Sequence, residues 1–563
     1  MRSINWQWVI IGAVAGLVIY LVIVPLGMLI FSSFRTVSPG EPGPFTFDNY
    51  IEAYSSAGTY ELLFNTAKFA LISVFIGIFF GVLFAWLVER TNTPLRHIGF
   101  VLIPLNTATP AMLYAIAWVL LLSPKVGLFN IALMHLFGLK EAPIQPYSIL
   151  GMGLVDGLRS VSVVFLMVVG IFRRMDPALE EAAAASGATV LTTMRSVTLK
   201  LMLPGTLAAM IYCITSSFDS FEIPAVMGMP RSIFVFSSKI WRASNQVNPN
   251  YGMVSTLGVI LLALAVLWVY LYNRTIRHMT AYATITGKGY RPSVIDLGRW
   301  KYLGTALIIT YFLISFVAPT LILIWASLLP FYKIPSIEGL SKVSLDAYRE
   351  ILTSAWLLDA LKNTAIVVLS ASTLCAFLST VVSWIVARTQ FYGRRILDTI
   401  SFLPNAIPGI VMALAFMWLY LRLTFIPIYG TIWIIMLAFT TKYLAFGTRT
   451  MNAAMVQIHK EIEEASEASG ASWPTTFFSI IVPLLIPSIV TVWIWAAMHS
   501  VRELSIPVML YSPESRVLSI LIWDNWGSGN VPTTCAIGVM LMIFIAALLL
   551  IGRIVATRRA PQF

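Results

Sequence analysis

Long apolar stretches separated by short polar segments run through the whole chain. A helix needs roughly 20 mostly apolar residues to cross the hydrocarbon core of a bilayer. Twelve stretches approach or exceed that length, near 9–32, 63–88, 98–122, 149–172, 205–226, 253–273, 302–328, 361–386, 397–422, 427–449, 485–508 and 534–555. The pattern predicts an all-α polytopic membrane protein with about twelve transmembrane helices.

The composition favours the same fold class. Of the 563 residues, 58% are hydrophobic and 11% are charged, whereas soluble domains carry about 25% charged residues. The apolar stretch from Val9 is longer than the core of a signal peptide and no small-residue cleavage pattern follows it, so we interpret it as a retained span. Cys213, Cys375 and Cys535 lie inside apolar stretches without metal-ligand spacing, and we interpret them as packing residues.

The net charge of +12 does not indicate nucleic-acid binding, because the basic residues lie in short loops and form no single patch. Lys and Arg collect on the cytoplasmic side of spanning helices. The segment from Arg274 to Lys301 carries six basic residues against one acid, Asp296. With this segment inside the cell, an even number of spans places both chain termini in the cytoplasm.

The chain contains an internal repeat. The stretch "FNTAKFALISVFIGIFFGVLFAWLVERT", which contains Arg90, matches "KNTAIVVLSASTLCAFLSTVVSWIVART", which contains Arg388. We interpret these arginines as topological anchors and predict two six-helix units, residues 1–290 and 291–563. Because six is even, both units enter the membrane in the same direction, as a parallel repeat.

A second repeated stretch lies in a predicted cytoplasmic loop. "EEAAAASGATVLTTMRSVTLKLMLPG" begins at Glu180 and "EEASEASGASWPTTFFSIIVPLLIPS" begins at Glu463. Alanine and glutamate favour helix, and Gly187 and Gly470 permit the chain to leave it. The pattern predicts a short helix, a break and a second helix that re-enters the membrane. Its alanines allow close approach of another protein, and its glutamates can bind Arg or Lys on that partner.

This loop resembles the EAA motif of the permeases of ATP-binding-cassette (ABC) importers, which reads Glu-Ala-Ala, three residues, Gly, nine residues, Ile, one residue and Leu-Pro. The second copy matches it at Glu464, Ala465, Ser466, Gly470, Ile480, Val482 and Pro483. The first copy matches it at Glu181, Ala182, Ala183, Gly187, Val197 and Leu199. Lys200 stands where the motif has proline.

The resemblance implies that each loop docks on an ABC ATPase subunit, so that one chain binds two copies of it. The residues assigned to this coupling are Glu180, Glu181, Ala182, Ala183, Gly187, Glu463, Glu464, Ala465 and Gly470. The resemblance also implies an external or periplasmic solute-binding protein, and a location in the bacterial cytoplasmic (inner) membrane with the lipid bilayer around the chain.

The solute is implied by the fused, two-unit form of the chain. With "SFDSFEIPAVMGMP" and "SVRELSIPVMLYSP" at corresponding places in its halves, the chain most resembles ferric-iron permeases. The resemblance therefore implies a membrane-spanning permease subunit that imports ferric iron. Thiamine, phosphonate, polyamine and sugar phosphate are the alternative solutes.

No ATPase motif is present, because "ITGKGY" lacks the first glycine and the final Ser or Thr of a Walker A sequence. We therefore expect no catalytic residue, cofactor or assigned metal in this chain, and we place ATP and Mg on the partner ATPase. A secondary carrier would also fuse two six-helix halves, but the loop after the second helix lacks the acidic and arginine-rich pattern of such carriers. A membrane scaffold without transport would not need paired docking loops.

Ionisable residues at membrane depth are functional candidates. Those near the ends of the fifth and eleventh spans are Asp219, Glu222, His499, Arg502 and Glu503. In the repeat, Asp219 corresponds to Arg502. The carboxylates could bind a hard cation, Arg502 could pair with them to close an outer gate, or the group could simply pack helix ends. Asp156 and Arg159 have the spacing of a pair within one helix.

Overall fold

The computed structural model describes residues 6–38, 41, 43–174, 178–279 and 294–559. Within these ranges the chain is helical apart from loops and one isolated β-bridge. The long helices of the first half are α1 (Trp6–Ser33), α3 (Ala57–Arg90), α7 (Ile149–Arg174), α10 (Leu199–Asp219) and α12 (Tyr251–Met279). Those of the second half are α13 (Lys301–Phe312) with α14 (Ala318–Ser327), α17 (Ala355–Arg388), α20 (Ile432–Gln457), α23 (Val482–Arg502) and α26 (Val531–Arg559).

The number of membrane-crossing helices agrees closely with the hydropathy pattern. Among the described residues, nine helices are long and apolar enough to cross a bilayer, and two bent helix pairs raise the number to eleven. The remaining predicted span, 427–449, corresponds to α20, which is 26 residues long but is made less apolar by Lys442 and Arg449. The prediction of an all-α polytopic membrane protein is therefore confirmed.

Proline determines where the two bent pairs break. The pairs are α4 (Arg96–Leu102) with α5 (Ala111–Leu122), and α18 (Arg394–Phe402) with α19 (Gly409–Arg422). They bend by 96° and 112°. Pro110 precedes α5 and Pro408 precedes α19, both with extended ψ. Proline disfavours helix at the residue before it, so each pair interrupts its backbone hydrogen bonding at the same place in the repeat.

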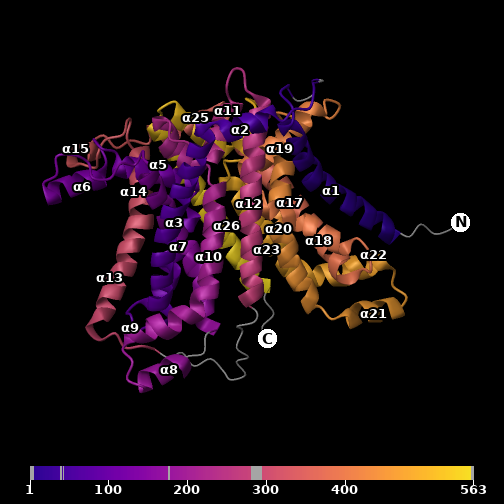
Figure 1. Cartoon of the computed structure of the whole chain (residues 1–563), viewed down its shortest axis with the longest axis horizontal. Helices are drawn as coiled ribbons and strands as arrows, with labels where there is room; N and C mark the ends of the chain where they lie inside the picture. Colours follow the sequence, from indigo (N-terminus) through magenta and orange to yellow (C-terminus); the bar gives the residue numbers. More distant parts are fainter. Residues whose placement is uncertain (1–5, 39–40, 42, 175–177, 280–293, 560–563) are drawn as a thin grey trace.

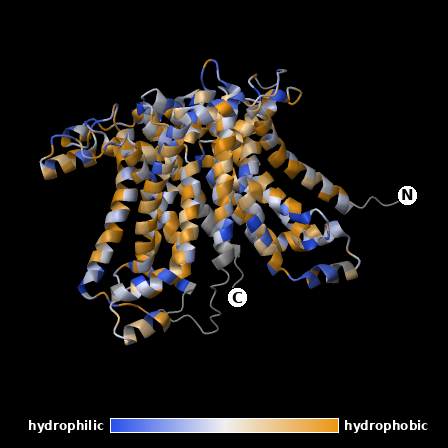
Figure 2. Cartoon of the chain, viewed as in Figure 1, coloured by the Kyte–Doolittle hydropathy of each residue, from blue (hydrophilic) through white to orange (hydrophobic). Residues whose placement is uncertain are grey.

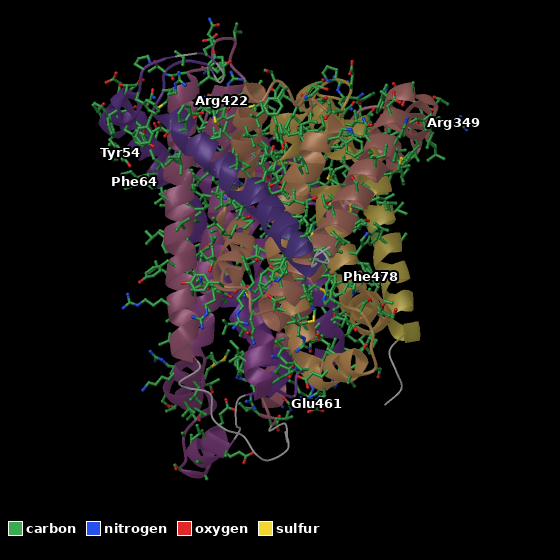
Figure 3. All side chains as sticks on the ribbon, turned by 90° about the vertical axis from the view of Figure 1, so that its right-hand side faces the viewer. Tyr54, Phe64, Arg349, Arg422, Glu461 and Phe478 are labelled. Atoms are coloured by element: carbon green, nitrogen blue, oxygen red, sulfur yellow. The ribbon has the colours of Figure 1, made fainter. Side chains whose placement is uncertain are left out.

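The two halves run in the same direction through the membrane. As Figure 1 is drawn, α8 (Ala178–Ala185) and α21 (Lys460–Ala468) lie at the lower end, and α2 (Asp48–Ser55), α11 (Phe236–Ser244) and α25 (Leu518–Gly527) lie at the upper end. Figure 2 shows apolar residues along the long helices and polar residues gathered at both ends. In Figure 3, Glu461 lies at the lower end and Arg349 and Arg422 lie at the upper end. A bilayer therefore fits between these ends.

The first helix of each half packs against the other half. α1 contacts α18 and α19, while α13 and α14 contact α4 and α5. Hydrogen bonds accompany these contacts, from Tyr20 Oη to Tyr420 Oη at 2.9 Å and from Asn106 Nδ2 to Tyr311 Oη at 2.9 Å. The halves are thus interlocked. The predicted boundary near 290 lies outside the described residues, so the division into two units stays a prediction.

The second half begins beside the lower end of α3. The Ile295 N–H donates to the Arg90 carbonyl at 2.9 Å, and the Asn92 N–H donates to the Ile295 carbonyl at 3.1 Å. The backbone N–H of Gly298, together with the Asn92 side chain, holds the pKa of Asp296 below its usual value. The Asp296 contacts are therefore retained at neutral pH and lost only as the pH falls through this lowered pKa.

Glycines bring α3 and α7 close together. A Cβ on Gly81 would lie 2.7 Å from Val164 Cβ, and a Cβ on Gly157 would lie 2.8 Å from Ile76 Cβ. Small residues are favoured at helix interfaces in membranes because they let two backbones approach. This helix pair forms the wall of the first half that positions the lower loop.

Gly157→Ala should therefore destabilise the protein by about 1–3 kcal/mol through overpacking. Gly170→Ala is the matched control in the same helix, because a Cβ there meets nothing within 4 Å. Thermal unfolding in detergent measures both variants. Equal midpoints for the two would contradict close packing of α3 on α7.

Candidate functional site: the repeated loops and a polar cluster on the pseudo-two-fold axis

The repeated loops form a short helix, a break and a second helix in both halves. α8 ends before Gly187, which has φ +81°, and α21 ends before Gly470, which has φ +83°. The chain then continues through α9 (Val190–Thr193) or α22 (Trp473–Thr476) into the long helices α10 and α23. Both positive φ values suit glycine, since other residues rarely adopt them. The predicted local structure is therefore present at each copy.

A π-helical turn stands at corresponding places in the two re-entering helices, at Met194–Thr198 and Phe477–Ile481. The proline of the motif, Pro483, follows this turn only in the second copy, where the first copy has Lys200. The turn therefore does not depend on that proline.

The first glutamate of each loop is directed into the protein. Arg90 Nε lies 3.7 Å from Glu180 Oε2, with both side chains buried. The Thr198 hydroxyl donates to Glu180 Oε1 at 2.6 Å. In the second copy, Arg388 Nε lies 2.7 Å from Glu463 Oε1. Glu180 and Glu463, which the resemblance assigns to coupling, therefore form ion pairs inside the chain, and their part in coupling stays a prediction.

The same arginines also bind the helix that precedes each loop. Arg90 Nη2 donates to the Phe172 carbonyl at 3.1 Å, near the end of α7. Arg388 Nη2 donates to the Met455 carbonyl at 2.9 Å, near the end of α20. Each arginine thus joins the ends of two long helices to the short helix of the loop. The interpretation of Arg90 and Arg388 as topological anchors missed this bracing role.

The second glutamate of each loop is exposed. Glu181 and Glu464 both lie on the surface, next to the exposed Ala182 and Ala465. Small side chains and a carboxylate are therefore presented together at the lower end, on helices whose position is fixed by the first glutamate.

Arg388→Met should destabilise the protein by about 3 kcal/mol, because it leaves the Glu463 carboxylate without its cation in a partly buried site. The double variant Arg388→Met with Glu463→Gln should recover most of this loss. Thermal unfolding and limited proteolysis near α21 measure the effect, with Arg395→Met on the exposed surface as the control. Equal losses in the single and double variants would contradict the bracing role.

Lys442 of α20 lies at the centre of a polar cluster between the halves. Its Nζ is 3.6 Å from Asp219 Oδ2 and 3.2 Å from Glu503 Oε1. Asp219 ends α10 of the first half, whereas Glu503 follows α23 of the second half. One ammonium group, only 16% exposed, therefore joins the two halves. Our sequence reasoning missed Lys442, although a lysine inside an apolar span is itself a functional signal.

Asp219 and Arg502 bind the broken helices of the opposite half. The Gly409 N–H, at the first residue of α19, donates to Asp219 Oδ1 at 2.6 Å. Arg502 Nη1 donates to the Thr107 carbonyl at 2.8 Å, just before the break that precedes α5. An anion is favoured at a helix N-terminus and a cation near helix-end carbonyls. Asp219, an acid, thus meets a backbone N–H, and Arg502, a base at the equivalent place in the repeat, meets a backbone carbonyl.

Two pairs of equivalent residues contact each other and mark the pseudo-two-fold axis. Ser505 Oγ donates to Glu222 Oε1 at 3.3 Å, across a sequence separation of 283. Trp241 and Trp523 are each the sixth residue of α11 and α25, and they pack edge to face with ring centroids 5.3 Å apart. Residues related by a two-fold axis meet only on that axis. The polar cluster therefore lies near this axis, and the tryptophan pair on α11 and α25 lies towards the upper end.

A cavity of ≈ 300 Å³ adjoins the cluster and is lined by Asp219, Lys442, Tyr443, His499 and Glu503, among others. Arg502 Nη2 lies 2.7 Å from His499 Nε2, so His499 accepts there and donates from Nδ1 to the Trp495 carbonyl at 2.8 Å. Among the described residues, no group of three or more His, Cys, Asp or Glu side chains is arranged to hold a metal ion. In this conformation the cation among the carboxylates is Lys442.

Arg159 of α7 stands at the position equivalent to Lys442, with the same separation of 283. Its predicted partner, Asp156, is bound instead by two hydroxyls on other helices, Ser73 at 2.6 Å and Ser217 at 2.9 Å. The prediction of a pair within one helix is therefore wrong, because hydroxyls on α3 and α10 reach the carboxylate. The structure thus brings the five predicted pathway residues near one axis and adds Lys442 to them.

Lys442→Met should destabilise the protein by about 3 kcal/mol, because the mostly buried Glu503 carboxylate and the partly exposed Asp219 carboxylate lose their shared cation. The triple variant that adds Asp219→Asn and Glu503→Gln should regain stability. Thermal unfolding measures both, and Arg449→Met on the exposed side of α20 is the control. If the triple variant is no more stable than Lys442→Met, the shared ion pairing does not hold the halves together.

Two parallel helical repeats that expose short helices at one end, and that bring charged residues together between them, fit a transport permease. The family of binding-protein-dependent transport system inner membrane components matches it twice, over residues 77–281 and 379–562. The chain belongs to this family, and it is a multi-pass inner-membrane permease of the ABC importer class.

Two of the similar curated proteins match most of the chain, and a third matches part of it. The ferric transport system permease protein FbpB of Actinobacillus pleuropneumoniae is 24% identical over 502 residues, which cover 87% of this chain and 71% of the relative. The putative ferric transport system permease protein FbpB 1 of Haemophilus influenzae is 26% identical, over 80% of this chain and 70% of the relative. The sulfate transport system permease protein CysT of Synechocystis is 25% identical, over 38% of this chain and 78% of the relative.

One of the similar solved structures is a bacterial alginate ABC transporter in complex with an alginate pentasaccharide-bound periplasmic protein. It aligns with 47% of this chain and 96% of its own chain, at 18% identity and a TM-score of 0.38.

Proposed function

We propose that this chain forms the translocation pathway for ferric iron in an ABC importer. The observation that carries the proposal is the coverage by relatives. Permeases named for ferric transport match up to 87% of this chain, including both halves. The sulfate permease matches 38% of it, about one half. The fused, two-half form is thus shared with the ferric group.

The proposed partners are inferred from the exposed helices at the lower end of the molecule. α8 and α21 both lie there (Figure 1), and each exposes one glutamate beside small residues. Two ABC ATPase subunits would dock on them and supply ATP hydrolysis with Mg, since this chain has no Walker A motif. This arrangement makes the lower end cytoplasmic, and an even number of spans then gives both chain termini a cytoplasmic location. A solute-binding protein then delivers the cargo at the upper end, as the family description implies.

The bracing arginines give the ATPase a mechanical connection to the membrane helices. Glu180 is bound to Arg90 at the end of α3, and Glu463 is bound to Arg388 at the end of α17. Movement of a docked helix would therefore move the helix pair above it. Closure of the two ATPase subunits would in this way rotate the halves about their common axis.

Rotation of the halves would change the charge around the central path. Lys442 and Glu503 belong to the same half and would stay paired, whereas the contact between Lys442 and Asp219 crosses the axis and would break. Asp219 would then face the opened path without Lys442 as its partner. Carboxylate oxygens suit a hard cation such as ferric iron, so the cargo would take the place that Lys442 leaves.

Uptake in the native host tests the solute. Deletion of the chain should abolish ATP-dependent uptake of radioactive ferric iron, and re-expression should restore it, while sulfate uptake stays unchanged. Loss of sulfate uptake with normal ferric uptake would overturn the ferric assignment and keep the importer class.

Glu181→Lys combined with Glu464→Lys should reverse both exposed docking charges without affecting folding, because these side chains are solvent-exposed. ATPase activity stimulated by the permease should fall at least about tenfold, which corresponds to 1.4 kcal/mol of lost coupling. Glu461→Lys, an exposed acid on the same helix α21, is the matched control. Full stimulation in the double variant would remove the docking role of these two residues.

A further inference from the structure

A large apolar cleft opens between α17, α23 and α26 in the second half. Its volume is ≈ 720 Å³, and its walls include Leu361, Leu369, Trp493, Val501, Ile537 and Phe544. The lining residues of α17 and α26 lie in the upper parts of these helices, away from α21. At its lips, Leu369 is 53% exposed and Ile543 is 65% exposed. The cleft therefore opens sideways, onto the surface that faces the bilayer.

In the equivalent region of the first half, two aromatic side chains stand between the helices. Phe218 of α10 and Trp268 of α12 contact each other with ring centroids 6.1 Å apart, and α10 packs along α12. The equivalent residues of the second half are Val501 and Leu548, and both line the cleft. The loss of two rings at one helix contact accounts for the open space between α23 and α26.

Two larger residues in the second half do not refill this space. Trp493 stands where the first half has Met210, but its indole N–H donates to the Thr373 hydroxyl at 3.1 Å, so the ring lies along α17. Phe544 stands where the first half has Leu264, and it is 49% exposed at the lip of the cleft. Among the described residues, these differences between the halves leave the space at α23 and α26 open in the second half.

The polar groups that line the cleft already form hydrogen bonds within the protein. Among the lining residues, Thr364 and Trp493 have side chains with a polar group. The Thr364 hydroxyl donates to the Ala360 carbonyl at 2.7 Å and accepts from the Leu518 N–H at 2.9 Å. Water needs two or more polar partners to occupy a cavity, and apolar cavities stay dry. An empty space of this size would forfeit the packing contacts of its walls.

We propose that this cleft is a binding site for the acyl chains of a phospholipid from the surrounding bilayer. The lips are continuous with the lipid-facing surface, so an acyl chain can enter from the side without crossing a polar barrier. We expect weaker lipid binding at the equivalent place in the first half, because Phe218 and Trp268 stand there at the positions of Val501 and Leu548. The proposal does not depend on the identity of the transported solute.

The bound acyl chains pack against the helix that links the two functional regions of the second half. α23 connects the loop that carries α21 to Arg502 and Glu503 beside the axis. Lipid in the cleft therefore supports α23 on the side where α26 does not. Removal of phospholipid should weaken the second half more than the first.

Photolabelling locates the lipid directly. The whole chain is reconstituted in nanodiscs that contain a phospholipid with a diazirine in its acyl chain, chased with excess unlabelled phospholipid, and then irradiated. We expect labels that survive the chase at Leu369 and Ile543, several-fold above the equivalent first-half positions Leu71 and Ala263. Equal labelling of the two halves after the chase would overturn the proposal.

A cleft-filling variant provides the second measurement. Val501→Phe with Leu548→Trp restores the aromatic pair of the first half, and Leu321→Trp on the exposed face of α14 is the control ring. The filled variant should retain less phospholipid through detergent washing, as counted by mass spectrometry, and should lose less thermal stability on delipidation than the wild type. If the folded filled variant retains as much phospholipid as the wild type and the control, the cleft is not the binding site.

Discussion

In the hydrocarbon core of a bilayer, every backbone polar group must be satisfied within the protein. The two bent helix pairs interrupt their backbone hydrogen bonds near Pro110 and Pro408, and the opposite half supplies partners for the groups released there. Asp219 of the first half binds the Gly409 N–H, and Arg502 of the second half binds the Thr107 carbonyl. Neither half can therefore break its helices without the other. This mutual dependence places the charged residues on the axis and holds the cavity beside them.

The two adjacent glutamates of each loop have different roles. The first of each pair is bound inside the chain by an arginine, and the second is left on the surface. Loss of one partner from an ion pair in a partly buried site costs free energy, because the other charge is left without a partner. The short helix is therefore held firmly at the end of α3 or α17. The exposed glutamate then acts from a fixed position, which a flexible loop would not provide.

Much of this architecture could be predicted from the sequence, because hydropathy and a repeat of fixed register determine spans, direction and the loop breaks at Gly187 and Gly470. The pairing of Arg90 with Glu180 could not, since these residues are far apart in the chain and only packing brings them together. The role of Lys442 could not be predicted either, because the apolar residues around it indicate only a membrane span and not the carboxylates that it meets. Asp156 was misassigned because spacing along one helix does not reveal the hydroxyls that approach from two others.

The contact between Glu222 and Ser505 has a consequence for the covalent fusion of the two halves. In a symmetric homodimer, a residue on the two-fold axis faces its own copy. Two Glu222 side chains would then meet as like charges, and Asp219 would have no Arg502 as its counterpart. In a single chain, each half has its own sequence and can change by mutation independently of the other half. Halves of different sequence can instead place an acid opposite a hydroxyl at the centre of the molecule, as Glu222 and Ser505 do.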